Sequence, residues 1–203
     1  MRKVLVGTFV SADGVMQAPG GPTEDQSGGF KFGGWIAPVF DDAAGAAVGE
    51  LFGKPYDLLL GRKTYDIFAA YWPNYKGEED AEIARGFDKA TKYVATSSRA
   101  PLSWKNSVAL HDPAKDVAKL KREDGPDIIV QGSSVLLETL LEHQLIDRLT
   151  IITFPVILGD GKRLFGKGAH SALKLVDSKS SKAGVTINTY ELAGDVKTGS
   201  MET

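Results

Sequence analysis

The sequence predicts an α/β fold, in which strands of a sheet alternate along the chain with helices. Residues 4–10 are apolar almost throughout, which is typical of a central strand covered on both faces. Residues 57–60 and 127–130 are shorter apolar runs, and each is followed by a glycine turn and then by apolar residues at helical spacing. This repeated order of strand, turn and helix favours a mostly parallel sheet.

The first strand leads into a turn and a long loop. Ser11-Ala12-Asp13-Gly14 breaks the strand, and Asp-Gly commonly marks a turn that needs a positive φ. Residues 17–34 are rich in glycine and proline and have no periodicity. A loop this long inside a compact domain is usually functional or disordered. Because it opens from the end of the first strand, we interpret it as a loop that covers a ligand.

A helix follows this loop. It begins near Val39 to Asp41, carries apolar residues on one face and ends at Gly53-Lys54-Pro55. Asp41 and Asp42 fall in its first turn. Two interpretations stay open: a favourable contact with the helix dipole, or a carboxylate that faces a substrate as proton donor or anchor.

Two glycine turns resemble anion sites. Gly61-Arg62-Lys63-Thr64 follows the strand at residues 57–60, and it places two cations where a helix N-terminus already favours anions. Gly132-Ser133-Ser134 lies before a second helix, whose apolar positions are Val135, Leu136, Leu137, Leu140, Leu141 and Leu145. Ordinary helix capping explains either turn alone, whereas two in one chain indicate a ligand with more than one phosphate.

Between these turns the pattern is less distinctive. The charged stretch 76–85 is interpreted as a solvated face. Residues 92–96 form a strand that ends in Ser97-Ser98-Arg99, which could hold a phosphate bidentately or form a solvent-exposed turn. Residues 108–110 form a short strand, and Asp112-Pro113 begins a helix that runs to about Arg122, with Val117 and Leu120 inward.

The end of the chain departs from the alternation. A long strand at residues 148–155 is followed by a loop, and strands around residues 173–176 and 185–192 form an antiparallel tail to the sheet. We therefore expect one domain over residues 1–193 and a flexible C-terminal tail over residues 194–203.

Composition limits the classes of partner. A net charge of -2 and a pI near 5.9 argue against nucleic acid or an anionic membrane as the main partner. The sequence has no cysteine, which excludes disulfides, and its three histidines lack metal-ligand spacing, so we expect no metal site. Since no apolar run approaches a signal peptide or a membrane span, we expect a cytoplasmic protein. The partner that we expect is a small-molecule substrate.

Taken together, five segments resemble the dihydrofolate-reductase-like family, most closely the branch with the reductase domain of bacterial riboflavin biosynthesis. In order they are Ser11-Ala12-Asp13-Gly14, Leu60-Gly61-Arg62-Lys63-Thr64-Tyr65, Lys92-Tyr93-Val94 with Ser97-Ser98-Arg99, Val130-Gln131-Gly132-Ser133-Ser134, and residues 155–165. The resemblance extends from about Val4 to Leu192. It implies a mixed, mostly parallel central sheet of about eight strands with helices on both faces, and NADPH as hydride donor.

The resemblance also implies roles for individual residues. Those expected at the phosphates of the cofactor are Gly61, Arg62, Lys63, Thr64, Ser97, Ser98, Arg99, Gly132, Ser133 and Ser134, and Gln131 is also expected to bind the cofactor. Because a guanidinium can pair a phosphate bidentately, Arg99 near the adenosine 2′-phosphate favours NADPH over NADH. Thr8, Asp13, Gly14 and Val15 would border the nicotinamide. The expected catalytic carboxylates are Asp41, Asp42 and Asp13.

Departures from the family pattern bear on the substrate. No arginine motif that would hold the glutamate tail of folate occurs between Tyr71 and Tyr93, and a chain without cysteine cannot carry the zinc-dependent deaminase usually fused to the riboflavin enzyme. We therefore expect a reductase that passes hydride to a C=N or C=O group of a small pterin-like, heterocyclic or sugar-linked compound. The alternatives are a non-catalytic NADPH-binding regulatory module and a dimeric structural protein. The resemblance also implies a homodimer, for which residues 185–192 could supply a sheet edge.

Overall fold

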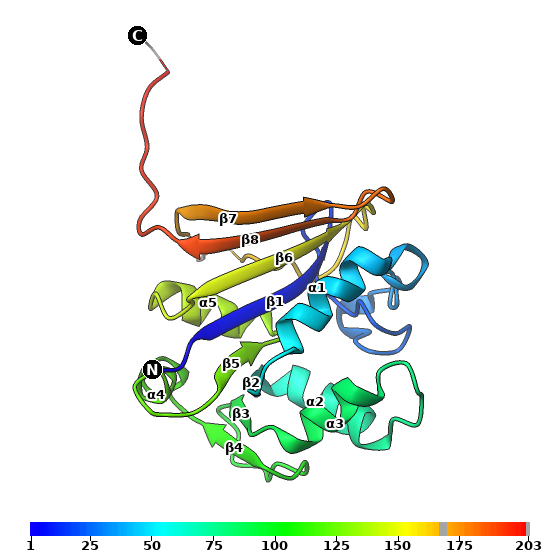
Figure 1. The fold of residues 1–203 in the computed structure, drawn as a ribbon, viewed down its shortest axis with the longest axis vertical. Helices are drawn as coiled ribbons and strands as arrows, with labels where there is room; N and C mark the ends of the chain where they lie inside the picture. The colour runs from blue at the N-terminus through cyan, green and yellow to red at the C-terminus, as the bar shows by residue number, and fades with distance from the viewer. Residues whose placement is uncertain (167–169, 202–203) are drawn as a thin grey trace.

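The computed structural model describes residues 1–166 and 170–201, and its central element is one eight-stranded sheet (Figure 1). The strand order is β4-β3-β2-β5-β1-β6-β8-β7; the pairs from β4 to β6 are parallel, and β8 is antiparallel to both of its neighbours. The predicted mixed, mostly parallel sheet is thereby confirmed. The strands are β1 (Val4–Ser11), β2 (Tyr56–Gly61), β3 (Lys92–Ala95), β4 (Ser107–Leu110), β5 (Asp127–Val130), β6 (Arg148–Phe154), β7 (Leu173–Ser180) and β8 (Thr186–Leu192).

Helices cover both faces of this sheet, as the family resemblance implied. One face carries α1 (Asp42–Phe52), α2 (Arg62–Tyr71) and α3 (Ala81–Lys89), and the other carries α4 (Pro113–Leu120) and α5 (Ser134–Glu142) (Figure 1). Successive side chains of β2 point to opposite faces of the sheet. Leu58 and Leu60 pack with Phe87 of α3 on one face, whereas Leu59 packs with residues of α4 and α5 on the other. Short 3₁₀ turns occur at η1 (Ser27–Gly29), η2 (Ala37–Val39) and η3 (Trp72–Asn74).

The N-terminal residues anchor the amino ends of several strands. The Arg2 side chain is buried and forms an ion pair with Asp57 of β2. Its Nε also donates to the carbonyl oxygen of Pro126 at 2.6 Å, just before β5, and its Nη1 donates to the hydroxyl of Tyr93 on β3 at 3.3 Å. One guanidinium thus joins the start of the chain to three strands at the end of the sheet where those strands begin.

The two tail strands differ from the sequence prediction in one respect. Residues 185–192 were expected to supply a sheet edge, but β8 lies between β6 and β7, so the edge strand is β7. All eight residues of β7 are exposed, including Leu173, Leu175 and Val176. The chain after β8 leaves the body as an extended segment (Figure 1).

Two helix predictions also need correction. The sequence pattern did not predict α3 within and after the charged stretch 76–85; it forms because Phe87 packs against Phe68 and Trp72, while the charged side chains of the helix stay at the surface. Val135 was assigned to the apolar face of α5 but is 69% exposed. It lies in the first turn, where the helix turns this position toward solvent.

Candidate functional site

The two glycine turns meet where the connections of the sheet diverge, and we call the surface around Gly61 and Gly132 the crevice. The chain leaves β2 toward β3 on one side and leaves β5 toward β6 on the other, so adjacent parallel strands send their connections in opposite directions. Ligands of open α/β sheets bind at such a point, outside the carboxyl ends of the strands. Here the amide of Gly61, at the end of β2, donates to the carbonyl oxygen of Gly132, just after β5, at 3.1 Å.

Both positions require glycine, for different reasons. A Cβ at Gly61 would collide with the Oγ of Ser133, which lies against the turn. Gly132 has a φ of +122°, a conformation that other residues rarely adopt. A Cβ there would also come within 3.2 Å of the Oγ1 of Thr64 and 3.5 Å of the Cε of Met16. The predicted anion turns therefore form one continuous surface, with the start of the 17–34 loop beside it.

Two helices begin at this surface. Helix α2 has Gly61 as its N-cap, no side-chain cap and no acidic residue in its first turn, so its first amides face the crevice without a side-chain acceptor. At the start of α5 the Oγ of Ser133 accepts from the amide of Leu136 at 3.5 Å, which matches the capping interpretation of that turn. Gln131 is held between strands, because its Nε2 donates to the carbonyl oxygen of Gly7 at 3.2 Å.

Arg62 connects α2 to the turn after β3. Its Nε lies 2.9 and 3.0 Å from the two carboxylate oxygens of Asp66, and its Nη1 donates to the carbonyl oxygen of Ala100 at 3.5 Å. Ser97, Ser98 and Arg99 are all exposed in that turn. The guanidinium of Arg62 therefore lies beside the segment that carries Arg99, although the two are far apart in the sequence.

The turn after β1 is held by Asp13. Its carboxylate accepts from the Oγ of Ser11 at 2.6 Å and from the amides of Leu158 and Gly159 at 3.1 and 2.9 Å. These hydrogen bonds lower the pKa of Asp13 to about 2. Asp13 is therefore ionised at neutral pH and is better suited to positioning the 158–159 segment than to donating a proton.

The remaining residues expected near the nicotinamide lie around the same turn. Gly14 has a φ of +83°, as the Asp-Gly turn predicted. Val15 is fully buried and pairs through its backbone with Arg163, so its side chain belongs to the core. Thr8 lies within β1 and is 7% exposed.

The two carboxylates at the start of α1 have different surroundings. Asp41 is the N-cap: it accepts from the amide of Ala44 at 3.0 Å, and a hydrogen bond with Ser181 of the β7–β8 turn is the main reason why the pKa of Asp41 lies below its ordinary value. Asp42 is exposed in the first turn. The preceding Phe40 is 43% exposed and stacks on Phe154 at the carboxyl end of β6. Asp41 therefore stands at the same edge of the sheet as the glycine turns, beside an aromatic surface.

An ion cluster that the sequence pattern does not predict ties the 17–34 loop to this edge of the sheet. The carboxylate of Asp25 accepts from the Nζ of Lys63 at 2.6 Å and from the Nζ of Lys162 at 2.7 Å. Gln17 is buried and holds the same region: its Nε2 donates to the carbonyl oxygens of Asp25 and Ser27, and its Oε1 accepts from the amide of Lys162 at 2.9 Å. These residues are far apart in the sequence, and only the folded chain brings them together.

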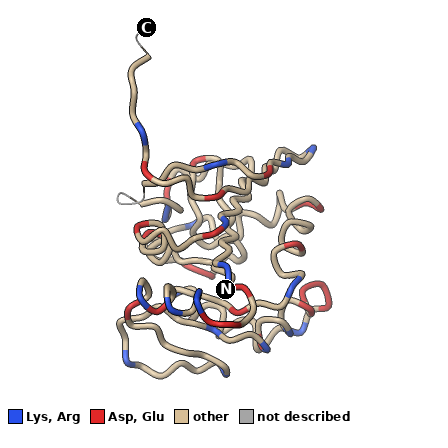
Figure 2. The backbone as a smooth tube through the Cα atoms, turned by 60° about the vertical axis from the view of Figure 1, so that its left-hand side comes forward, with Lys and Arg blue, Asp and Glu red and all other residues tan. Residues whose placement is uncertain are grey.

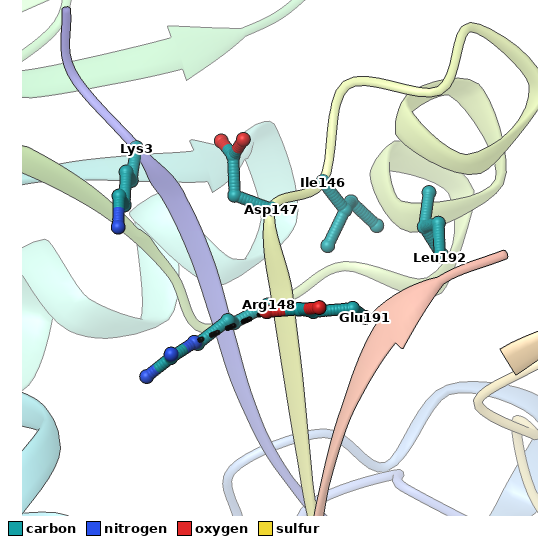
Figure 3. Close-up of a pocket in the computed structure, with 6 residues that line it drawn as sticks. All are labelled: Lys3, Ile146, Asp147, Arg148, Glu191 and Leu192. Carbon is teal, nitrogen blue, oxygen red and sulfur yellow. Dashed lines mark ion pairs between the residues drawn. The ribbon is translucent and has the colours of Figure 1, made fainter. Parts of the chain in front are cut away.

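Surface hollows occur at both ends of the strands. A hollow of about 180 Å³ lies between the 17–34 loop and the segment around Lys162, beside the ion cluster. A larger one, of about 320 Å³, lies at the amino ends of β1 and β6, and Figure 3 shows Lys3, Asp147, Arg148 and Glu191 around it. We place the candidate site at the carboxyl ends despite the smaller volume, because the glycine turns and helix N-termini converge there.

The distribution of charge, the possible metal ligands and the lengths of the helices bear on other kinds of site. Figure 2 shows Lys and Arg interspersed with Asp and Glu along the backbone. Among residues 1–166 and 170–201, no group of three or more histidine, aspartate or glutamate side chains could hold a metal ion. No helix in that part of the chain combines the length and apolar character needed to cross a membrane.

Comparisons with known proteins agree with this architecture. The uncharacterized protein YyaP of Bacillus subtilis is 24% identical over 195 residues, which cover 95% of this chain and 96% of YyaP. A putative riboflavin biosynthesis protein from Shewanella sp. PV-4 has a similar structure, with a TM-score of 0.65, 20% identity and coverage of 95% of this chain and 99% of that one. Dihydrofolate reductase from Enterococcus faecalis, solved in complex with NADP(H) and RAB-propyl, has a TM-score of 0.59 at 13% identity, and the match covers 94% of this chain and 96% of that one.

The family comparison covers most of the sequence. Residues 2–187 match the RibD C-terminal domain family. This match includes both glycine turns, the turn after β1 and every strand of the parallel part of the sheet. The chain therefore belongs to the RibD C-terminal domain family and has a dihydrofolate-reductase-like, reductase-type fold.

Proposed function

We propose that this protein is an NADPH-dependent reductase that transfers hydride to a C=N or C=O group of a small pterin-like, heterocyclic or sugar-linked substrate. The observation that carries the proposal is the contact between Gly61 and Gly132, which joins two anion-type turns at the point where the sheet connections diverge. The dihydrofolate reductase of E. faecalis, which shares the fold, is described with NADP(H) bound.

The residues at the crevice fit a dinucleotide with three phosphates. Uncapped amides at the start of α2 and the glycine turns suit the pyrophosphate, with Lys63, Thr64, Ser133 and Ser134 around them. Arg62 and the turn of Ser97, Ser98 and Arg99 suit a further phosphate on the ribose. Thr8, Asp13, Gly14, Val15 and Gln131 would border the nicotinamide, which supplies hydride when the cofactor is bound.

The substrate would lie on the other part of the same edge, between the start of α1 and the ends of β1 and β6. Phe40 offers an exposed aromatic surface there, and Asp41 offers an ionised carboxylate beside it. Because the pKa of Asp41 is lowered, we assign it the role of an anchor that accepts a hydrogen bond and orients a water, and the water supplies the proton. Asp42 is more exposed to solvent than Asp41, so we assign it a smaller contribution to the reaction.

We also propose that the protein acts in the cytoplasm as a homodimer. The dimer contact belongs to β7, since this strand, and not β8, is the open edge and carries exposed Leu173 and Leu175. Sedimentation of the wild type and of a Leu175→Lys variant tests this. A monomeric wild type would remove the dimer from the proposal without affecting the reductase.

The deciding experiment is a titration of the purified protein with NADPH and, separately, with NADH, followed by tryptophan and nicotinamide fluorescence. We expect Arg62→Ala and Arg99→Ala each to weaken NADPH binding by about tenfold, which corresponds to the loss of a charged hydrogen-bonded pair, and to change NADH binding little. Arg85→Ala is the control, because Arg85 is exposed on α3, away from the crevice. Absence of binding by either dinucleotide would refute the reductase.

The same preparation separates the reductase from a non-catalytic NADPH-binding module. A reductase oxidises NADPH when the right pterin, heterocycle or sugar-linked compound is added, and the rate depends on Asp41. A binding module would bind NADPH with the same dependence on Arg62 and Arg99 but would oxidise it with none of these compounds.

A further inference from the structure

Three segments that are distant in the sequence converge on the carboxylate of Asp25. Its Oδ1 accepts from the Nζ of Lys63 at 2.6 Å, and its Oδ2 accepts from the Nζ of Lys162 at 2.7 Å. The Oγ of Ser27 lies 2.9 Å from the Lys63 ammonium and 2.8 Å from the Lys162 ammonium, and it donates to Oδ1 of Asp25 at 2.6 Å. The two ammonium groups are therefore held side by side around one small acidic group.

The charges in this cluster are not balanced. The Asp25 side chain is only 9% exposed, and burial by itself would raise its pKa. Hydrogen bonds from Lys162, Lys63 and Ser27 outweigh burial and hold the pKa well below its ordinary range, so the carboxylate is ionised. One negative charge faces two positive charges. A phosphate group, which can carry two negative charges and several acceptor oxygens, matches the two lysines better than a single carboxylate does.

The cluster lies beside the crevice. Lys63 is the second residue of α2, and its neighbour Thr64 lies close to Gly132. The Lys162 backbone pairs with the start of the 17–34 loop, because its carbonyl oxygen accepts from the amide of Met16 at 2.8 Å and its own amide donates to Gln17. The Met16 side chain in turn lies near Gly132. Lys162 therefore reaches the cluster from the segment after β6, whereas Lys63 reaches it from the start of α2.

We propose that Lys63, Lys162 and Ser27 form a phosphate-binding subsite at the mouth of the crevice, in which the Asp25 carboxylate takes the place of the phosphate until a ligand enters. Where the phosphate belongs to a dinucleotide, this inference rests on the proposed reductase function. A sugar phosphate substrate offers the same chemistry. In either case the ligand and Asp25 compete for the same two ammonium groups.

The backbone around Asp25 is held separately from its carboxylate, which bears on whether a phosphate can replace that carboxylate on the two lysines. Gln17 holds the segment through the carbonyl oxygens of Asp25 and Ser27, at 3.0 and 2.9 Å, and does not touch the Asp25 carboxylate. Turning the Asp25 side chain away from the lysines would also break its hydrogen bonds from the amide and the Oγ of Ser27, at 3.0 and 2.6 Å, but it would leave the two contacts with Gln17 in place. Binding of a phosphate would then loosen the side-chain ties of the 17–34 loop without detaching it.

The test is calorimetric titration of the whole chain with inorganic pyrophosphate, ribose 5-phosphate and NADPH. The variants are Asp25→Asn, Lys162→Met and the double variant, and Asp124→Asn is the matched control, since Asp124 is exposed before β5 at the other end of the sheet. Asp25→Asn removes the competitor, so we expect pyrophosphate to bind about threefold or more tightly, in line with the strength of partly exposed ion pairs. Lys162→Met should weaken binding, and in its background Asp25→Asn should have a smaller effect.

Each outcome decides a separate point. Pyrophosphate binding that is unchanged or weaker in Asp25→Asn overturns the subsite. So does unchanged binding in Lys162→Met, which keeps Asp25 and serves as the test if Asp25→Asn does not fold. Tightening for NADPH identifies the dinucleotide as the source of the phosphate, and tightening for ribose 5-phosphate alone identifies a substrate. If pyrophosphate responds as expected but NADPH never binds, the subsite stands and the reductase proposal fails. If all variants bind NADPH equally and the binding of pyrophosphate and of ribose 5-phosphate does not change either, the reductase is supported and the subsite is removed.

Discussion

The amide of Gly61 donates to the carbonyl oxygen of Gly132 at 3.1 Å, and this hydrogen bond joins the end of β2 to the end of β5. The strands themselves pair only as far as Leu59 and Val130, so the bond extends the contact beyond the regular ladder and into the two turns. It fixes the separation of the first residues of α2 and α5. The spacing between the two helix N-termini is thus set by backbone, without a long side chain.

Replacing Gly61 by alanine tests this contact. The φ of Gly61 is -67°, which any residue adopts, so the whole effect comes from the collision of the new Cβ with Ser133. We expect a loss of about 1–3 kcal/mol in the free energy of unfolding, as for other overpacked sites. NADPH binding should weaken with it. The control is Gly49→Ala in α1, where a Cβ meets nothing within 4 Å; denaturant titration should show equal or greater stability than the wild type.

Asp41→Asn isolates the charge of the α1 N-cap. Asparagine caps helices as well as aspartate does, so the fold should be kept, with only a small loss of melting temperature from the weaker hydrogen bond with Ser181. Turnover of NADPH with a substrate should fall by about tenfold or more, because the ionised acceptor beside Phe40 is lost. Asp42→Asn should have a smaller effect, since Asp42 is exposed. Full turnover in both variants would remove the carboxylate from the proposed chemistry.

Asp13→Asn should reduce stability in a pH-dependent way. The pKa of Asp13 is about 2 in the folded protein against an ordinary 3.8, so its ionised form stabilises the fold above the ordinary pKa, and this contribution is lost as the pH falls through the folded pKa. The wild type should therefore melt at a higher temperature than Asp13→Asn near neutral pH. The difference should shrink below about pH 4. A difference that stays constant down to that range would contradict an ionised Asp13.

The contribution of Lys92 to stability should also rise with pH, but in a higher pH range, and because burial favours its neutral form. It is fully buried, its Nζ donates to the carbonyl oxygens of Phe87 and Asp88 at the end of α3, and it lies 4.4 Å from the ring centre of Trp104. Burial lowers its pKa from 10.5 to about 8. Between these values the folded protein has released a proton that the unfolded chain still holds, so the contribution of Lys92 to stability rises with pH.

Comparison with Lys92→Met measures this contribution. The melting temperature of the wild type, relative to that of the variant, should increase from about pH 7 to about pH 10. A relative stability that does not change over this range, or that decreases, would show that the pKa of Lys92 is not lowered.

Local pattern was sufficient for most of the fold. The apolar run of β1, the strands at Leu58 and Ile128, and the proline after Asp112 each carry their own signal, because burial and capping act on neighbouring residues. The turns at Gly61 and Gly132 were also found in this way, since glycine followed by cations or hydroxyls is a local arrangement. Their meeting at one edge followed from parallel pairing.

The features that sequence did not reveal depend on distant contacts. The cluster of Asp25, Lys63 and Lys162 joins three segments, and nothing in the glycine-rich loop around Asp25 distinguishes it from an ordinary solvated turn. Helix α3 was missed because its charged residues dominate the pattern, whereas Phe87 finds its apolar partners on other helices. The position of β7 at the edge follows from the order of the last two strands in the sheet, which their sequences do not encode locally.

The direction of β8 determines how the molecule can be attached to a surface for measurement. Tyr190 pairs with Leu149, so β8 ends where β6 begins, and the segment from Gly194 leaves at that end of the sheet (Figure 1). The glycine turns lie at the other end. A sensor chip, bead or fluorophore coupled through the C-terminal segment would therefore leave the crevice facing solution, whereas coupling through surface lysines would risk modifying Lys63 and Lys162 themselves.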